Sequence, residues 1–159
     1  MEEADHALVA VIKQRIDFAA DRALRDCIAL AAPAPEFLVR VGRERLERFD
    51  TRYPHLIEGL LAQLDPGGVV VHVSIPPDLS STTLRCTPES TVEDLCLELA
   101  EEVQQLLIEG ELWGAPWPPC PIHDGHHPLW PERISGRAAW TCSKPPGFSR
   151  PVGTLTGNR

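Results

Sequence analysis

Prolines and tryptophans are concentrated at one end of this chain, and their distribution restricts where regular secondary structure can form. Nine of the 16 prolines and all four tryptophans lie after Gly110. Proline has no backbone N–H and restricts the residue before it, so helices and central strands contain few prolines. We therefore divide the chain into a body, residues 1–110, and a proline- and tryptophan-rich segment, residues 111–145. Residues 146–159 have few apolar side chains and are expected to form a mobile tail.

Apolar residues repeat at helical spacing in three parts of the body. The longest run predicts a helix over about 3–31, which ends before Pro33 and Pro35. Two shorter patterns predict helices over about 36–49 and 54–64. At a rise of about 1.5 Å per residue, the first helix would be roughly 42 Å long. It would therefore either cross the whole body or offer part of its apolar face to a second copy in a homo-oligomer.

After these helices, the spacing of apolar residues changes from a helical repeat to one at every second residue. Residues 69–75 (VVVHVSI) have an aliphatic side chain at every odd position, which is typical of a half-buried strand. A return strand is expected over about 82–87, and a helix over about 91–109 follows it, with Ser90 or Thr91 as its N-cap. The pattern predicts an α+β body, in which a helical N-terminal region is joined to a β-hairpin with a covering helix.

Charge is unevenly distributed along the chain. Residues 1–110 contain 20 acidic side chains and 10 Lys or Arg, whereas residues 111–159 contain 3 acidic side chains and 5 Lys or Arg. An acidic body repels phosphate backbones, which disfavours nucleic acid as a partner. Three of the first five residues are acidic where a signal peptide would be basic, and no apolar run reaches membrane-spanning length. These features predict a cytoplasmic protein without membrane contact, whose five cysteines are thiols or metal ligands.

Soft donor side chains gather between residues 120 and 142, in the sequence CPIHDGHHPLWPERISGRAAWTC. Cys120 and His123 are separated by two residues, a spacing at which both side chains can bind one ion across a tight turn. Residues 129–142 predict a small hairpin whose second strand returns Cys142 to this pair. The candidate metal ligands are Cys120, His123, His126, His127 and Cys142.

Thiolates and imidazoles in a four-coordinate shell are typical of structural zinc sites. Some 30 proline-rich residues bury too little apolar surface to fold alone. Bound zinc can supply folding free energy on the order of 10 kcal/mol. We therefore expect zinc as a cofactor that cross-links and stabilises the C-terminal hairpin. In the alternative without metal, the histidines are loop residues and Cys142 is a small buried apolar residue.

Residues 117–145 resemble zinc knuckles and zinc-ribbon tails. The sequence CPIH is similar to one knuckle, and AAWTC is similar to the strand that leads into a second. The resemblance implies metal-binding roles for Cys120, His123 and Cys142. It covers under a fifth of the chain, and no family is identified for residues 1–110.

The sequence departs from a ribbon after Cys142. A second ribbon knuckle would place another Cys or His where this chain has Pro145. The fourth ligand must then be His126 or His127, or the site stays open.

We favour a non-catalytic interaction or scaffold protein, because four protein ligands leave no position for a substrate. Its partner would be another protein, and its binding residues would be tryptophans, which are enriched at binding hot spots. Trp113 and Trp117 are expected to be surface anchors, and Trp130 and Trp140 to shield the ion or to pack the hairpin onto the body.

Two other function classes stay open. In a zinc hydrolase or nuclease, three ligands would hold the ion, water would take the fourth place, and a spare histidine or Asp124 would act as base. In a nucleic-acid-binding protein, the basic side chains after Gly110 would contact phosphates. These side chains include Arg133, Arg137, Lys144 and Arg150.

Overall fold

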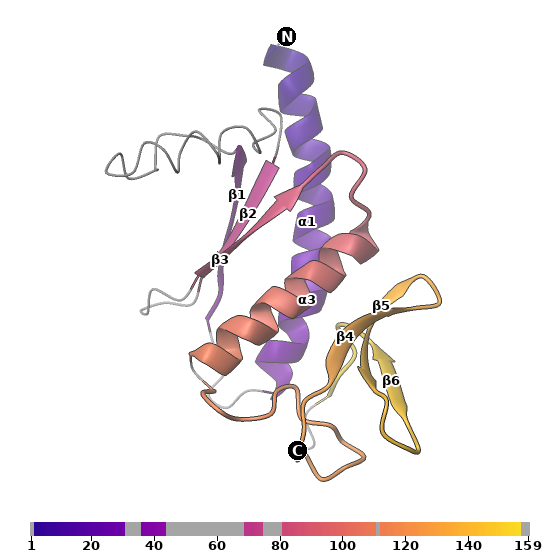
Figure 1. Ribbon diagram of the computed structural model, residues 1–159. Helices are drawn as coiled ribbons and strands as arrows, with labels where there is room; N and C mark the ends of the chain where they lie inside the picture. Colours follow the sequence, from indigo (N-terminus) through magenta and orange to yellow (C-terminus); the bar gives the residue numbers. More distant parts are fainter. Residues whose placement is uncertain (1, 31–35, 44–68, 75–80, 111, 157–159) are drawn as a thin grey trace, which may run out of the picture.

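The computed structural model describes residues 2–30, 36–43, 69–74, 81–110 and 112–156. Its elements are α1 (Glu2–Leu30), β1 (Leu38–Arg43), β2 (Val69–Ser74), β3 (Ser81–Cys86), α3 (Val92–Glu109), β4 (Trp130–Ile134), β5 (Arg137–Cys142) and β6 (Phe148–Pro151). The strands form two antiparallel sheets, with the orders β1-β2-β3 and β4-β5-β6. Helix α3 packs on α1 and contacts both sheets (Figure 1). The architecture confirms the expected α+β class.

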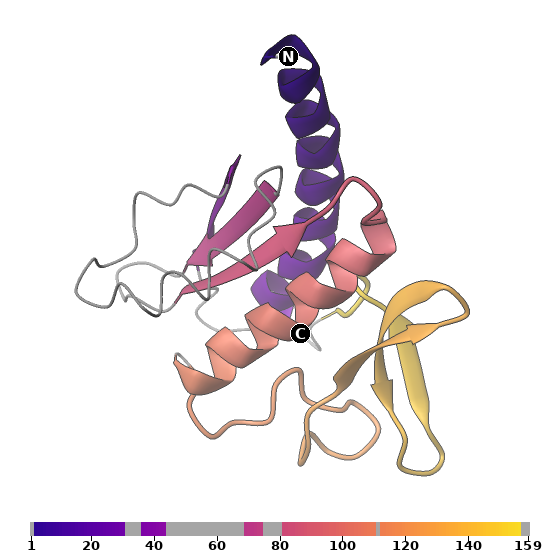
Figure 2. The same cartoon turned by 45° about the horizontal axis from the view of Figure 1, so that its top comes forward.

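Helix α1 has the length that its apolar pattern predicts. Its buried face includes Ile12, Ile16, Ala19 and Ala23, and the small alanines allow α3 to approach closely. The N-terminal end of α1 projects beyond both sheets (Figure 2). Three apolar side chains of α1 stay exposed, namely Val11, Phe18 and Ile28. A homo-oligomer formed through this helix remains a prediction. No helix of the described residues combines the length and the apolar character needed to cross a bilayer.

The first sheet buries the odd-numbered side chains of its central strand. Val69, Val71 and Val73 are each at most 1% exposed, while His72 and Ser74 lie on the opposite face of β2 and are only partly buried. This alternation confirms the strand expected over 69–75 for its described part. The return strand is also confirmed, as β3, and it pairs with β2 so that Leu84 lies opposite Val71.

The helix expected over 36–49 is wrong in its described part. Leu38–Arg43 instead form β1, which pairs with β2 and places Val39 opposite Val73. The apolar spacing in this stretch fits a helix or a strand. Its two valines favour a strand, Gly42 disfavours a helix, and the edge of β2 supplies backbone partners. Residues 44–49 and the expected helix over 54–64 lie outside the described residues.

Helix α3 begins at a capping box. The Thr91 side chain accepts a hydrogen bond from the Asp94 N–H (3.1 Å), and the Asp94 carboxylate accepts one from the Thr91 N–H (2.9 Å). Of the two expected caps, Thr91 is therefore the one used. The helix ends at Gly110, whose N–H donates to the Leu106 carbonyl.

The C-terminal segment forms a three-stranded sheet, which is one strand more than the expected hairpin. β4 and β5 turn at Ser135 and Gly136, both with positive φ, and β6 pairs with the other edge of β5. The expectation of a mobile tail over 146–159 is therefore corrected in its described part. Val152 and Leu155 are buried against the body, and the residues before them, Phe148–Pro151, form β6.

Candidate metal centre

A closed loop between α3 and β4 positions the first two donors. The Leu129 N–H donates to the Pro118 carbonyl (2.7 Å), and the Cys120 N–H donates to the His127 carbonyl (3.0 Å), so the two ends of the loop lie side by side. Inside it, the Gly125 N–H donates to the Cys120 carbonyl (3.0 Å). This tight turn requires positive φ at residues 124 and 125, which Asp-Gly tolerates. We call residues 118–129 the knuckle loop.

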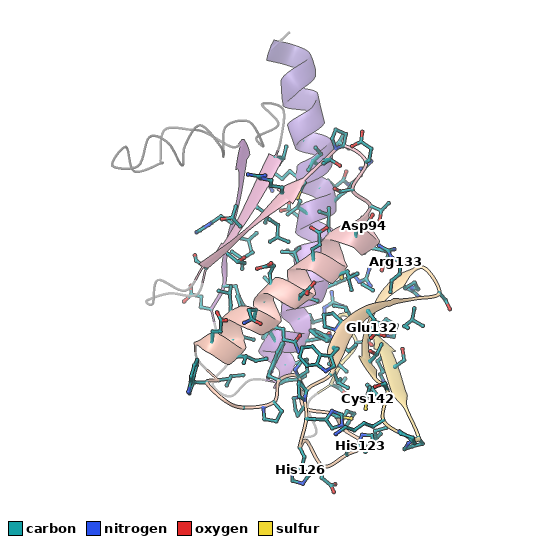
Figure 3. The ribbon with its side chains drawn as sticks, in the orientation of Figure 1. Asp94, His123, His126, Glu132, Arg133 and Cys142 are labelled. Carbon is teal, nitrogen blue, oxygen red and sulfur yellow. The ribbon has the colours of Figure 1, made fainter. Side chains whose placement is uncertain are left out.

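Strand β5 brings the last donor to the knuckle loop. Cys142 ends β5 and lies opposite Phe148 of β6. Figure 3 shows His123 and Cys142 next to each other, whereas His126 lies at the outer end of the knuckle loop. Cys120, His123, His127 and Cys142 form the cluster, so of the two histidines left open by the sequence it is His127 that joins it. We call these four residues the metal cluster.

The donor atoms lie at the separations of a small coordination shell. The Cys120 Sγ is 3.2 Å from His123 Nδ1, and the Cys142 Sγ is 3.5 Å from the same nitrogen and 3.6 Å from His127 Nε2. All four donor atoms lie within 4.8 Å of one another. Bonds of about 2.3 Å to sulfur and about 2.0–2.1 Å to nitrogen would place tetrahedral donors about 3.3–3.8 Å apart. The cluster could therefore hold one metal ion.

The outer nitrogens of both imidazoles face backbone carbonyl oxygens. His123 Nε2 is 3.0 Å from the Pro145 oxygen, and His127 Nδ1 is 3.0 Å from the Pro128 oxygen. A carbonyl oxygen only accepts hydrogen bonds, so in each neutral ring the outer nitrogen carries the proton. The inner nitrogens then direct lone pairs into the cluster, 3.1 Å apart. Metal-binding histidines are oriented in this way, with the second nitrogen donating to a carbonyl.

Burial and hydrogen bonds act in opposite directions on Cys120, which is fully buried. Burial raises the pKa of its thiol, the backbone N–H groups of Ile122 and His123 lower it, and the neighbouring Cys142 raises it; the net pKa is raised. A cation between the donors would reverse this balance, because a coordinating thiol is deprotonated.

The tryptophans divide into two exposed and two buried side chains. Trp113 and Trp130 are 79% and 57% exposed. Trp117 and Trp140 are at most 3% exposed, and their rings meet edge to face at 5.9 Å. The expectation that Trp117 is a surface anchor is therefore corrected, because the ring fills the core beneath the knuckle loop. Trp140 packs the sheet onto the body.

Two buried polar residues that the sequence reading missed hold this segment in place. Gln104 of α3 donates from Nε2 to the Trp117 and Leu129 carbonyls, both at 2.7 Å, and so joins the two flanks of the knuckle loop. Asp26 of α1, fully buried, accepts from Trp140 Nε1, from the Gly153 N–H and from the Leu155 N–H at 2.6–2.8 Å. Each lies inside an apolar helical stripe, and this position is the signal that could have identified them.

Among the described residues of the segment, one basic side chain is paired and the others lie at different places on the sheet. Arg133 is paired with Asp94 of α3, and Figure 3 shows these two side chains facing each other. Arg137 is exposed at the turn end of β5, and Lys144 lies in the β5–β6 loop. Asp124 and His126, the alternative bases, are both exposed.

Comparisons of this chain with protein-family models, with curated proteins and with solved structures gave no match. The geometry of the metal cluster is therefore the basis for assigning a function.

Proposed function

We propose that the protein is a non-catalytic, zinc-binding interaction protein, in which the ion holds residues 112–156 in the shape that a partner protein recognises. The observation that supports this most directly is the orientation of the two histidines, whose outer N–H groups donate to backbone carbonyls and whose inner nitrogens meet two sulfurs. Sulfur and imidazole donors in equal number suit zinc better than magnesium or calcium, which prefer oxygen.

A structural role fits this donor set better than a hydrolytic one. Four side chains are enough to fill a tetrahedral shell without water, whereas a catalytic zinc keeps one position for water. Both cysteines are buried, with 0% of Cys120 and 6% of Cys142 exposed, which limits the approach of a substrate. The described cysteines are all free thiols, which fits the reducing cytoplasm.

The exposed tryptophans support the interaction role. Trp113 and Trp130 flank the knuckle loop in the sequence and both are exposed, so they are available to a partner, and tryptophan is enriched at binding hot spots. Trp117 and Trp140 would contribute to binding only indirectly, by supporting the loop from inside the core.

Metal analysis of purified variants tests this proposal. The wild-type protein, purified without added metal, is expected to contain one zinc per chain, and cobalt exchanged into the site should give the absorption bands of a tetrahedral Cys2His2 complex. Cys120→Ser and His127→Ala should each lose the bands, because a shell reduced to three ligands binds the ion weakly.

Two matched variants control this experiment. His126→Ala changes the adjacent histidine, whose side chain is outside the metal cluster, and Cys96→Ser changes a core cysteine; both should retain one metal per chain. A wild-type protein without stoichiometric metal would contradict the proposal, as would a His126→Ala variant that loses metal when His127→Ala keeps it.

A further inference from the structure

A small cavity lies beside the metal cluster, and the function that we have assigned to that cluster does not account for it. Its volume is about 260 Å³. Its apolar walls come from Leu30 at the end of α1, from Ile122 in the knuckle loop and from Phe148 on β6. Arg150, on the same face of β6 as Phe148, is the one charged residue among the described residues that line it.

The Arg150 guanidinium has no partner in the described part of the chain. It makes no hydrogen bond or ion pair with the residues that the structure describes, and it is exposed at the cavity. Arg22 and Arg133 differ from it, since each is paired with an acidic side chain of α3. An apolar cavity bordered by an unpaired guanidinium is complementary to an apolar group with a carboxylate beside it.

The size of the cavity favours a peptide over a free small molecule. Pockets that enclose a small-molecule ligand usually measure about 300–1,000 Å³. A cavity of about 260 Å³ is smaller and better suited to one or two side chains of a longer chain. We propose that this cavity binds a partner-protein peptide that presents a bulky apolar residue next to an aspartate or glutamate, with Arg150 pairing the carboxylate.

The walls of the cavity depend on the metal cluster, so this inference rests on the proposed function. Two lining prolines, Pro119 and Pro121, flank the ligand Cys120, and Phe148 lies opposite the ligand Cys142 in the sheet. Loss of the ion would release the knuckle loop from β6 and separate the two walls. Peptide binding should therefore require metal.

Titration of the isotope-labelled, full-length protein, followed by NMR, tests the proposal with two defined probes. The first is the peptide acetyl-Gly-Leu-Asp-Gly-amide and the second is the same peptide with lysine in place of aspartate. The aspartate peptide is expected to shift the signals of Ile122 and Phe148 and to bind at least about tenfold more tightly than the lysine peptide. Arg150→Glu should reverse the preference, whereas Arg137→Glu, a charge reversal on the same sheet but outside the cavity, should preserve it.

Several outcomes would overturn the docking proposal. These are equal binding of the two peptides, no response to Arg150→Glu, binding that is undiminished in metal-free Cys120→Ser, and binding that appears only when the chain is cut after Thr156. If the protein self-associates and Arg150→Glu abolishes this, the occupant of the cavity is a second copy of the chain. If octanoate binds and neither peptide does, the occupant is a small carboxylate. Either result would overturn the proposed peptide partner. Metal content measured on the same samples separates the proposed zinc site from the proposed peptide site. Metal-loaded protein that binds neither peptide would contradict only the peptide site.

Discussion

The body and the C-terminal segment both bury cysteines, but the neighbours of these cysteines differ. Cys27, Cys86 and Cys96 lie in the apolar core of the body, where burial raises the pKa of Cys86 and of Cys96 to about 11 and that of Cys27 further. They are neutral thiols near pH 7. Cys120 and Cys142 are buried to a similar extent, yet each sulfur faces an imidazole nitrogen at hydrogen-bonding distance. Burial therefore does not distinguish a core thiol from a candidate metal ligand, whereas the neighbouring atoms do.

The two regions are also stabilised differently. The body contributes most of the large aliphatic side chains of the core, from α1, β2 and α3. The segment joins the same core through a few residues such as Leu129, Trp140 and Val152, and it is tied to the helices by buried polar contacts. If the metal and these contacts stabilise a segment that buries little apolar surface, their removal should destabilise residues 112–156 more than the body.

Metal removal has the largest expected effect on this comparison. Chelation should remove binding free energy on the order of 10 kcal/mol and should increase amide hydrogen exchange at Cys120 and Leu129 far more than at Leu99 and Val103 of α3. Hydrogen-exchange mass spectrometry before and after chelation, followed by addition of zinc, measures this. Unchanged exchange at the knuckle loop after complete metal loss would show that the segment folds without the ion.

The substitution Asp26→Ala has the second-largest expected effect, a loss of stability. The substitution leaves three buried donors without an acceptor and should lower the free energy of unfolding by about 3–5 kcal/mol. Asp21→Ala, on the exposed face of the same helix, breaks only a surface pair with Arg25 and should cost less than about 0.5 kcal/mol. Urea unfolding of the two variants checks this, and equal losses would mean that Asp26 is not essential for holding the sheet on α1.

Glu93→Gln has a smaller, pH-dependent effect. Glu93 accepts from Arg22 (2.6 Å) and from the Ala138 N–H (2.7 Å); burial raises its pKa, but these hydrogen bonds lower it more, so the net pKa lies below the ordinary value of 4.5. The ionised form therefore stabilises the fold above about pH 4.5, and this stabilisation is lost as the pH falls through the lowered folded-state pKa. At neutral pH the variant should be about 1–2 kcal/mol less stable than wild type.

The pH dependence of that difference is the decisive measurement. Unfolding at several pH values should show the gap between wild type and Glu93→Gln narrowing below about pH 4.5. A gap that stays constant down to acidic pH would mean that Glu93 contributes by packing and not by charge.

Elements with one clear apolar period were predicted well from the sequence. The apolar stripes of α1 and α3 and the alternation of β2 each identify the face that the structure buries, although Val11 and Ile28 of α1 stay exposed. β1 was predicted wrongly because its short apolar spacing fits a helix or a strand, and the choice depends on the open edge of β2. β6 was missed because four residues with one aromatic side chain carry too little pattern, and the pairing with β5 decides their structure.

The donor types and their spacing come from the sequence alone, since Cys120, His123 and Cys142 are identified by their chemistry and by the turn and strand around them. The choice of His127 over His126 is decided by the tertiary structure, because adjacent residues in a tight turn point in different directions and only one ring reaches the two sulfurs. The same holds for Asp26 and Gln104, whose partners lie far along the chain and meet them only when the helices pack against the segment. The sequence determines which donor and polar side chains are present, and long-range packing determines which of them come into contact.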